Sequence, residues 1–583
     1  MRLRIRLSLV IACLSVLTLA GTLAAAPAYP VKVGPTGRYL VDQNGAPFLI
    51  VGDSPQAMIG RVSESDAELF LARRQAQGFN TVWINLLCAT YIGCNADGST
   101  FDGIAPFNTE GDLTTPNEAY FARVDAILRI AARYGFLVIL DPAETGDWLA
   151  VLYANGEDNC RAYGQFLGRR YAGFDNIIWM HGNDYQEYGP DPDRFTIALA
   201  RGIKDFDSRH LHTVELNFLV SSSTDDPLWI PIIDLNAAYT YEPVYAEVQK
   251  DYNRNDGLPV FMVESGYEFE NGDSRAMRAQ AYWSVLSGAT GHLYGNRYTW
   301  PFLDGWQDQL NSPGAVQMSN FTALFQSRPW FELVPDQGHN VVTSGLGDFG
   351  STEYVTAART SDGRLVIAYV PSNRTITVDM GQLSGPAITR WYDPASGAFI
   401  AISDSALSNS GVIEFTTPGT NADGYEDWVL VLEASSGSPP PPPPPPSVPS
   451  FIDFTMASDT FGPGDQLDVS LKASNGAQSH RELYTGVLGP DDQTIIYFTG
   501  PNTIGGYATA GSLANMRPLA LVGPGQVLTL SEANALLAFR LPSGVPPGVY
   551  TLFAFLVSPG DLPGSLFDPG DGDVVAYRAV KLY

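Results

Sequence analysis

Short apolar runs alternate with longer amphipathic segments over residues 45–335 of the chain. Each run has the length of one strand and is apolar on both faces, as strands are when helices cover both sides of a parallel sheet. The eight runs are FLIVGD (48–53), TVWINLL (81–87), FLVILDP (136–142), IIWMHGND (177–184), HTVELN (212–217), LNAAYTYE (235–242), VFMVESG (260–266) and GHLYGN (291–296).

The amphipathic segments between the runs predict helices. One of them opens with Ser63 or Ser65, either of which can cap a first turn, and ends at Gly78. Another spans residues 118–135 and has the same design. Strands that alternate with helices in this way predict an α/β fold, a (β/α)8 TIM barrel, over residues 29–337. A doubly wound open sheet is the alternative, although no G-x-G-x-x-G motif follows the first strand.

The pattern changes to β structure after the predicted barrel. Short strands separated by turns predict a β-sandwich over residues 338–434. An unbroken run of prolines, Pro439–Pro446, predicts a polyproline II spacer of roughly 25 Å within a linker, residues 435–449. Runs such as QTIIYFTG and GVYTLFAFLV then predict an immunoglobulin-like β-sandwich over residues 450–583.

Residues 1–28 predict a secretory signal peptide. Three arginines precede the apolar run Leu7–Ala20, and an A-x-A-like cleavage site lies near Ala26 or Ala28. No later stretch reaches the roughly 20 apolar residues that a transmembrane helix needs. We therefore expect a secreted protein, extracellular or periplasmic, without a transmembrane segment.

Cysteine content and net charge limit which cofactors and partners we expect. Cys88, Cys94 and Cys160 remain after the signal, so we expect one disulfide, whose pairing the sequence leaves open. No Cys/His spacing resembles a zinc site, and we expect neither a metal nor a cofactor. The formal net charge of −28 argues against nucleic acid as a partner, since such binding requires basic residues. It fits a neutral substrate, or it only keeps an exported protein soluble.

Two carboxylates stand where barrel enzymes carry out their chemistry. Asp184 follows the fourth predicted strand and Glu264 ends the seventh, so both should face the bowl at the C-terminal ends of the strands. Cleavage of a glycosidic bond requires such a pair, one group protonated and one ionised. Alternatively, Asp184 caps a helix that begins near Pro192, and Glu264 pairs with an arginine such as Arg297.

Further strand-end residues are candidates for supporting roles. We expect Asn183 to bond the 2-hydroxyl of a sugar, and Asp53 either to bond a hydroxyl or to stabilise a turn. The donors expected to hold Glu264 are Asn183, Tyr239, His292 and Tyr294. The aromatic candidates for sugar platforms, or else parts of the core, are Trp148, Tyr185, Tyr241, Tyr267, Trp300 and Trp306. If Asp184 does not have the predicted catalytic role, the carboxylates to test in its place are Glu144, Asp147 and Glu242.

Several segments resemble one family, known as domain of unknown function 4038, which includes glycoside hydrolase family 140. The segments are VGDSP (51–55), GFNTVWINLL (78–87), IIWMHGND (177–184), VESGYE (263–268), RAQAYWSVLSGATGHLYGN (278–296) and QMSNFTALFQSRPWFELVPD (317–336). Characterised members are retaining glycosidases that release apiose from a plant pectic side chain. The resemblance implies that Asp184 is the general acid/base and Glu264 the nucleophile. It also implies that residues 340–434 form the domain that this family labels as putative collagen-binding.

The sequence departs from the family around the expected bowl. Gly52-Asp53-Ser54 is followed by Pro55, where the family often has Gly-Asp-Thr and a nearby Trp, and the loop 90–117 is individual. These departures affect the expected identity of the sugar more than the expected type of reaction.

The resulting hypothesis is a secreted retaining glycosidase acting on a neutral plant- or wall-type glycan with apiose- or arabinose-containing side chains. The alternatives are a non-catalytic glycan- or matrix-binding protein with a degenerate barrel, and an endo-acting enzyme on arabinan-like chains. The last domain either tethers the protein to a glycan or cell surface or is passive. A retaining pair should lie about 5–5.5 Å apart and an inverting pair about 6.5–9.5 Å apart.

Overall fold

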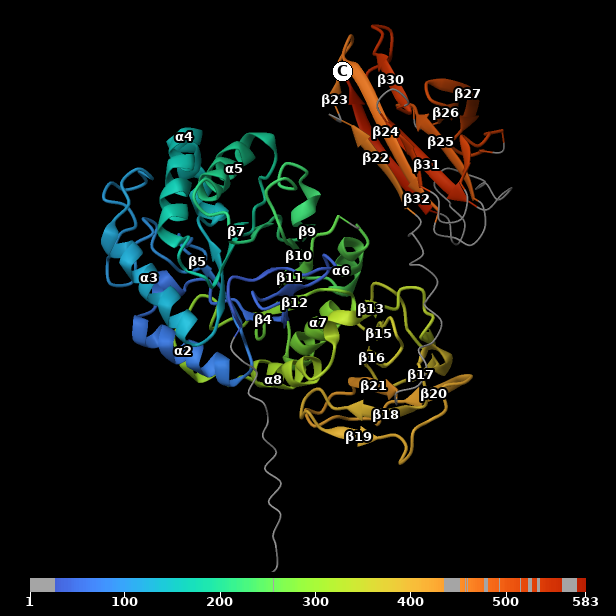
Figure 1. Ribbon diagram of the computed structural model, residues 1–583. Helices are drawn as coiled ribbons and strands as arrows, with labels where there is room; N and C mark the ends of the chain where they lie inside the picture. The colour runs from blue at the N-terminus through green and yellow to red at the C-terminus, as the bar shows by residue number, and fades with distance from the viewer. Residues whose placement is uncertain are drawn as a thin grey trace, which may run out of the picture. The chain divides into compact units, whose positions relative to one another are not determined.

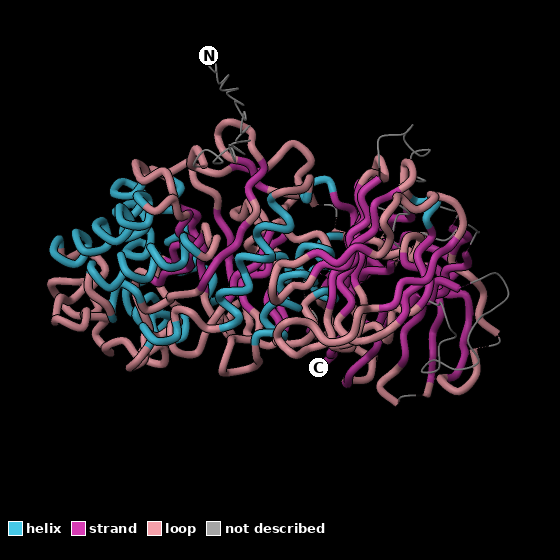
Figure 2. The backbone as a smooth tube through the Cα atoms, turned by 90° about the horizontal axis from the view of Figure 1, so that it is seen from below, coloured by secondary structure: helices cyan, strands magenta, loops and turns pink. Residues whose placement is uncertain are grey.

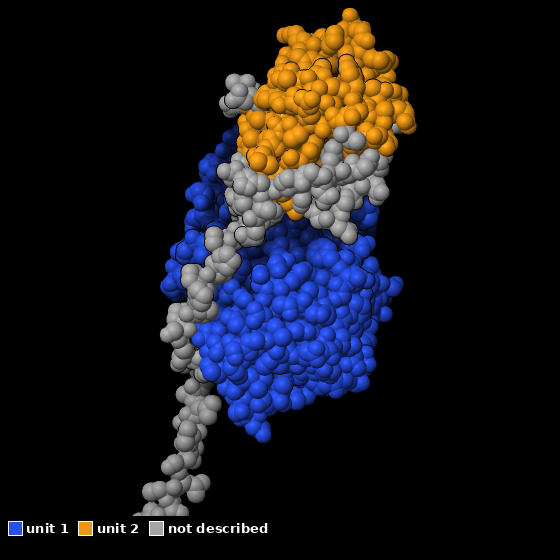
Figure 3. All heavy atoms as spheres, turned by 90° about the vertical axis from the view of Figure 1, so that its right-hand side faces the viewer, with its two compact units in different colours: residues 1–440 blue, residues 441–583 orange. Residues whose placement is uncertain are grey.

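The computed structural model describes residues 27–434 except 255, and parts of 451–583. The gaps in the last segment are 457, 459, 476–480, 492, 514, 523–526, 532–534 and 558–573. Almost all of the expected signal peptide and the whole proline-rich linker lie outside the described residues. The chain divides into two units, residues 1–440 and 441–583, which Figure 3 colours separately.

Eight parallel strands form the first domain, one from each predicted run (Figure 1). They are β4 (Ile50–Asp53), β5 (Thr81–Asn85), β6 (Leu137–Asp141), β7 (Ile177–Gly182), β8 (His212–Glu215), β10 (Asn236–Thr240), β11 (Val260–Glu264) and β12 (Gly291–Tyr294). Their order in the sheet is β8-β7-β6-β5-β4-β12-β11-β10, with β9 (Val220–Ser222) antiparallel to β10. The first strand therefore pairs with the last, which occurs in a barrel and not in a doubly wound sheet, so the TIM-barrel prediction is confirmed.

A side chain bridges the remaining seam of the barrel, between β8 and β10. The hydroxyl of Ser223 donates to the carbonyl of Val214 at 2.5 Å and accepts from the amide of Ala237 at 2.8 Å. These two bonds satisfy main-chain groups at strand edges that would otherwise be unpaired in the barrel wall.

Helices surround the barrel strands (Figure 2). They are α1 (Met58–Arg61), α2 (Glu64–Ala76), α3 (Glu118–Arg133), α4 (Thr145–Tyr171), α5 (Pro190–Lys204), α6 (Tyr245–Tyr252), α7 (Ser274–Leu286) and α8 (Pro313–Gln326), with short 3-10 turns η1 (Ser223–Asp225), η2 (Trp306–Gln309) and η3 (Trp330–Glu332). Ser63 caps α2 by accepting from the amide of Asp66 at 3.1 Å, which decides between the two predicted caps. Among the described residues, no helix is both long and apolar enough to cross a bilayer.

The strands divide their side chains between two cores. Along β7, Ile178 and Met180 point into the barrel, whereas Ile177 and Trp179 pack against the helices. This alternation is the two-residue period of a β-strand, and it explains why the runs are apolar on both faces. A small antiparallel sheet of β1 (Lys32–Val33), β2 (Leu40–Val41) and β3 (Pro47–Phe48) contributes to the interior core.

A β-sandwich follows the barrel within the same unit. One sheet has the order β13-β15-β16-β21-β18-β19 and the other β14-β17-β20. The strands are β13 (Leu333–Pro335), β14 (Val342–Ser344), β15 (Thr356–Thr360), β16 (Leu365–Val370), β17 (Thr375–Asp379), β18 (Ala387–Tyr392), β19 (Phe399–Ala401), β20 (Val412–Thr416) and β21 (Trp428–Ala434), with a 3-10 turn η4 (Met380–Gln382). The larger sheet packs on the barrel, where the rings of Tyr282 and Tyr369 stack 5.2 Å apart. One face of the larger sheet therefore belongs to the hydrophobic core around the barrel, whereas its other face forms a separate core between the two sheets of the sandwich.

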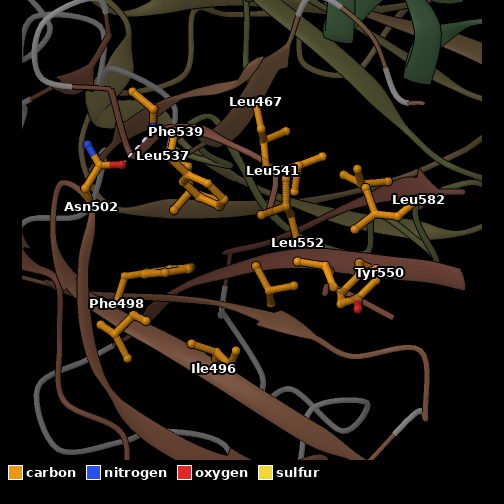
Figure 4. A pocket seen from close by; sticks show the side chains of 15 residues that line it. Leu467, Ile496, Phe498, Asn502, Leu537, Phe539, Leu541, Tyr550, Leu552 and Leu582 are labelled. Carbon is orange, nitrogen blue, oxygen red and sulfur yellow. Dashed lines mark hydrogen bonds between the residues drawn. The ribbon is translucent and has the colours of Figure 1, made fainter. Parts of the chain in front are cut away.

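The second unit is another sandwich of two sheets. One sheet has the order β22-β24-β29 with β30 beside β24, and the other β23-β32-β31-β25-β26-β27 with β28 beside β25. The strands are β22 (Phe451–Met456), β23 (Thr460–Phe461), β24 (Gln466–Ser474), β25 (Arg481–Leu488), β26 (Thr494–Gly500), β27 (Thr503–Thr509), β28 (Ala520–Val522), β29 (Val527–Leu530), β30 (Leu537–Arg540), β31 (Gly548–Val557) and β32 (Val574–Leu582). A cavity of about 480 Å³ lies between the sheets, lined by apolar side chains such as Leu467, Phe498 and Leu552 (Figure 4).

Candidate active site

Asp184 and Glu264 meet at one hydroxyl group. The Tyr239 hydroxyl lies 2.9 Å from Oδ1 of Asp184 and 2.8 Å from Oε1 of Glu264. The two carboxylate oxygens are therefore at most about 5.7 Å apart, the sum of 2.9 Å and 2.8 Å. The barrel brings together two residues that lie far apart in the sequence, at the strand ends where barrel chemistry gathers.

A left-handed stretch of backbone carries the first carboxylate. Gly182, Asn183 and Asp184 have φ angles of 100°, 75° and 49°. A side chain at Gly182 would place a Cβ 2.1 Å from the carbonyl oxygen of Glu215, so only glycine fits there. Asn and Asp tolerate the left-handed region best among the other residues, and strain of this kind clusters at functional sites. This geometry explains why an amide and a carboxylate follow an apolar strand.

A β-bulge directs the second carboxylate. Ala238 on β10 pairs with Met262 on β11, but the next residue, Tyr239, pairs with Glu264, so β11 has one extra residue. Val263 points into the barrel, and strict alternation would turn Glu264 outward toward the helices. The bulge redirects Glu264 to the bowl, as bulges near active sites commonly do.

Three tyrosines and a glutamine hold Glu264. Tyr241 and Tyr239 donate to Oε1 at 2.7 and 2.8 Å, and Tyr267 donates to Oε2 at 2.9 Å. Gln56 approaches Oε2 at 3.4 Å and bonds the Tyr267 hydroxyl at 3.0 Å. Glu264 is 6% exposed, and no arginine contacts it among the described residues, so the alternative role as an ion-pair partner does not hold.

The donors around the pair favour one distribution of charge. Burial raises the pKa of Glu264, with the Asp184 carboxylate as the second cause, and burial also raises the pKa of Asp184. Three tyrosine hydroxyls oppose the rise in pKa at Glu264 and only one opposes it at Asp184. Tyr239 has a single hydrogen for two carboxylates. Both contacts are satisfied when Asp184 is protonated and donates to Tyr239, which in turn donates to an ionised Glu264.

More carboxylates lie beneath the pair. Glu215 and Asp141 are fully buried, and burial raises the pKa of each well above its usual range. Glu215 accepts from the amide of Asp184 at 3.4 Å, whereas its Oε1 has no partner. The neighbouring Glu264 and Asp184 charges also raise the pKa of Glu215. Burial therefore favours the neutral form of both Glu215 and Asp141. Within the described parts of the chain, no three His, Cys, Asp or Glu residues are placed to hold a metal ion.

The three carboxylates considered as replacements for Asp184 either cap a helix or lie exposed to solvent. Glu144 caps α4 by accepting from two amides of its first turn and also accepts from Tyr91 at 3.0 Å. Asp147 is exposed and bonds Thr90, and Glu242 is exposed. The helix that Asp184 was a candidate to cap, α5, has Gly189 at its N-cap instead.

Among the described residues, three of the candidates for supporting roles are not hydrogen-bonded to Asp184 or Glu264: Asp53 has the turn role, one of the two expected for it, whereas Tyr294 and His292 were expected to hold Glu264. The Asp53 carboxylate pairs with Arg74 in the interior and accepts from the amide of Ser54 at 2.7 Å, so it stabilises a turn and an ion pair. Tyr294 is buried and donates to Glu268, not to Glu264. His292 is buried on β12, where burial lowers its pKa to about 3 and keeps the ring neutral. None of the three is hydrogen-bonded to Asp184 or Glu264 in the described structure.

The aromatic candidates separate into core and site residues. Trp148 and Tyr185 are buried, with polar atoms bonded to the Cys88 carbonyl and the Asp193 carboxylate. Trp306 also packs in the core, against Phe70 and Phe302. The candidates near the pair are Tyr241, which is 45% exposed, Tyr267, and Trp300, whose ring contacts that of Tyr267.

Sequence reasoning missed several residues of the site. Gln56 and Tyr91 lie in loops without a periodic signal, and Glu215 ends β8 as Glu264 ends β11. Asn85 ends β5 and donates from Nδ2 to Oδ1 of Asn183 at 2.8 Å. For Glu215 and Asn85, a systematic search for polar residues at strand ends would have been the signal. The disulfide joins Cys88 to Cys94, and Cys160 is a buried free thiol.

Two family models match consecutive parts of the chain. The family model "Apiosidase-like, catalytic domain" matches residues 35–332, and "Putative collagen-binding domain of a collagenase" matches residues 334–433. Among curated proteins, no sequence matches the chain.

Two solved structures of glycoside hydrolases match about 70% of the chain. A "Glycoside hydrolase" is 25% identical with a TM-score of 0.62 and covers 70% of this chain and 98% of its own. A glycoside hydrolase family 5 protein from Bacteroides vulgatus is 25% identical with a TM-score of 0.61, covering 69% of this chain and 93% of its own. The catalytic-domain model spans just over half of the 583 residues, and the chain therefore belongs to the apiosidase-like family of the glycoside hydrolase type.

Proposed function

We propose that the protein is a retaining glycoside hydrolase in which Asp184 is the acid/base and Glu264 the nucleophile. The observation that carries this proposal is the shared Tyr239 hydroxyl, which limits the separation of the two carboxylate oxygens to about 5.7 Å. That limit lies close to the roughly 5–5.5 Å of retaining pairs and below the roughly 6.5–9.5 Å that leave room for the water of an inverting enzyme.

In the first step, Glu264 attacks the anomeric carbon of the sugar. The bond from that carbon to the leaving oxygen breaks, and Asp184 gives its proton to this oxygen. Tyr241 and Tyr267 hold the two oxygens of Glu264 from different sides, which fixes the direction of attack. The products of this step are a free alcohol and a sugar esterified to Glu264.

In the second step, Asp184 acts as the base. It takes a proton from a water molecule, whose oxygen bonds to the anomeric carbon as the ester bond to Glu264 breaks. Between the two steps the negative charge has moved from Glu264 to Asp184. The Tyr239 hydroxyl lies within 2.9 Å of both, so its single hydrogen can turn from one carboxylate to the other and follow the charge.

The electrostatics of the site favour a neutral sugar. Asp184, Glu264, Glu215 and Asp141 gather at the strand ends, and none of them has a lysine or arginine partner among the described residues. A uronic acid would bring a second negative charge beside the ionised Glu264, and burial and mutual repulsion already raise the pKa of the surrounding carboxyl groups, so its binding would be costly. We therefore propose a neutral plant- or wall-type glycan, with apiose- or arabinose-containing side chains as the first substrates to test.

Secretion is part of the same proposal. The Cys88–Cys94 disulfide fits an oxidising compartment, which supports removal of residues 1–28 during export to the periplasm or the exterior. We further propose that the last sandwich, residues 450–583, holds the enzyme near a glycan or a cell surface.

The test is hydrolysis of a panel of pectic, apiose- and arabinose-containing glycans and the matching aryl glycosides. We expect Glu264→Gln to lose well over about 100-fold in kcat, while the exposed control Glu242→Gln keeps it. Asp184→Asn should lose most on glycosides with poor leaving groups, because activated aryl groups depart without a proton. NMR of the first product should show retained configuration. Near-normal turnover by Glu264→Gln, or an inverted product, contradicts the proposal.

A further inference from the structure

Asn183, beside the proposed acid/base, is the last member of a chain of buried side chains. The indole nitrogen of Trp83 donates to Oδ1 of Asn85 at 2.8 Å. Nδ2 of Asn85 then donates to Oδ1 of Asn183, also at 2.8 Å. Trp83 and Asn85 are fully buried in β5, and Asn183 is 1% exposed.

The chemistry of this chain fixes the direction of both amides. An indole N–H only donates, so the atom of Asn85 that faces Trp83 must be its oxygen. The amino group of Asn85 therefore faces Asn183 and requires the oxygen of Asn183 in turn. The usual ambiguity between the oxygen and nitrogen of an amide is thereby resolved by one donor-only group at the start of the chain.

The main chain of Asn183 is held as firmly as its side chain. Its carbonyl accepts from the hydroxyl of Thr145 at 2.9 Å, and its φ of 75° fixes it next to Asp184. Among the described residues, Nδ2 of Asn183 has no acceptor within hydrogen-bond distance. This atom is not one of the fully buried unpaired polar atoms of the described structure, so it is accessible from the bowl and free to donate to a ligand.

We propose that Trp83 and Asn85 are positioning residues that keep Asn183 as a hydrogen-bond donor toward the hydroxyl next to the anomeric carbon of the substrate. This inference rests on the proposed function and goes beyond it by naming two residues that never touch the sugar. When Asn183 donates to the hydroxyl oxygen, the hydroxyl hydrogen is left for the carboxylate of Glu264. A reversed amide would take that hydrogen for itself and remove the bond to the nucleophile.

The substitution Asn85→Asp reverses the direction of the hydrogen bond between residues 85 and 183 with almost no change in the shape of the side chain. The new carboxylate still accepts from Trp83 but offers Asn183 an acceptor instead of a donor, so the amide of Asn183 must turn. Asn176→Asp is the matched control, because Asn176 is also a buried asparagine that donates to a carbonyl, that of Phe136 at 2.9 Å, and it adjoins the other end of β7.

Kinetics on two substrates separate positioning from general damage. On a glycoside with the 2-hydroxyl, kcat/KM of Asn85→Asp should fall about 10- to 100-fold relative to wild type, the value of one hydrogen bond to a charged partner. On the 2-deoxy glycoside the loss should stay below about 3-fold, and Asn176→Asp should match wild type on both within about 3-fold. The deficit should grow from about pH 5 to about pH 9, because a protonated carboxyl group can still donate to Asn183. Equal losses on both substrates, or no loss at any pH, overturn the inference.

A neutron structure of the wild-type protein tests the chain without any substrate. Deuterium should lie on the Asn183 atom that faces away from Asn85, and deuterium on the facing atom overturns the inference. A wild-type protein that hydrolyses no glycoside would refute the proposed function, while the neutron structure would still decide the orientation of the chain.

Discussion

A buried ion pair joins the barrel to the sandwich that follows it, and removing one partner should unfold both together. Arg278 on α7 and Asp427, just before β21, are fully buried and form two parallel hydrogen bonds of 2.7 Å. Asp427 also accepts from Tyr369 at 3.0 Å and from Asn421 at 2.9 Å. Asp427→Ala removes all four acceptor contacts and leaves the Arg278 charge in the interior.

The expected loss follows from that burial. Deleting one partner of a buried ion pair costs about 3–5 kcal/mol, mainly because the remaining charge stays desolvated. Arg278 keeps one charged partner, Asp423, at 2.9 Å, so we expect the lower part of that range. The control is Asp362→Ala, which removes a pair with the Arg364 side chain at 3.2 Å and a hydrogen bond from the Arg364 amide at 3.1 Å. The two side chains of this pair are 41% and 46% exposed. That change should cost no more than about 1 kcal/mol.

Urea unfolding of the full chain provides the assay. Tryptophan fluorescence reports on both domains, because Trp391 and Trp428 lie in the sandwich core and other tryptophans lie in the barrel. Loss of glycosidase activity reports on the barrel and its site. Since one face of the larger sandwich sheet packs into the core around the barrel, both signals should move to lower urea together in Asp427→Ala. A barrel transition at unchanged urea concentration, or a loss below about 1 kcal/mol, would refute the reasoning and make residues 338–434 an independent module.

Two further predictions concern ionisation. Burial raises the pKa of Glu144, Asp193 and Asp251 to about 7, so the folded protein binds these protons more tightly than the unfolded chain does. The free energy of unfolding should therefore fall as the pH rises from about 4 to about 7.5. A melting temperature that rises over this range would contradict the prediction. Burial also raises the pKa of Cys160 to about 12. Ellman's reagent should therefore find no thiol in the native protein that lacks residues 1–28 and one thiol after denaturation, and rapid reaction of the native protein would contradict this prediction.

Local patterns in the sequence determined the elements and the general location of the site. The eight apolar runs correspond to β4–β8 and β10–β12, because burial on both faces leaves a signal that needs no knowledge of distant residues. Ser63 and Gly78 marked the ends of α2 through capping chemistry that acts within one turn. Asp184 and Glu264 were found because the C-terminal ends of parallel strands face one bowl whatever the details of packing.

Tertiary structure alone decided which side chains face each other. A one-residue bulge turns Glu264 inward, and the sequence VFMVESG has no periodic pattern that predicts this bulge. Asp53 and Tyr294 were candidates for the bowl, but Asp53 pairs with Arg74 and Tyr294 donates to Glu268. The positions of these partners depend on how separate elements pack. The hydrogen-bonded series Trp83–Asn85–Asn183 likewise links β5 to the residue that follows β7, although β6 lies between these two strands. The physical reason is that periodicity records which face is buried, whereas the partner of a polar group depends on direction and distance, which only the folded chain fixes.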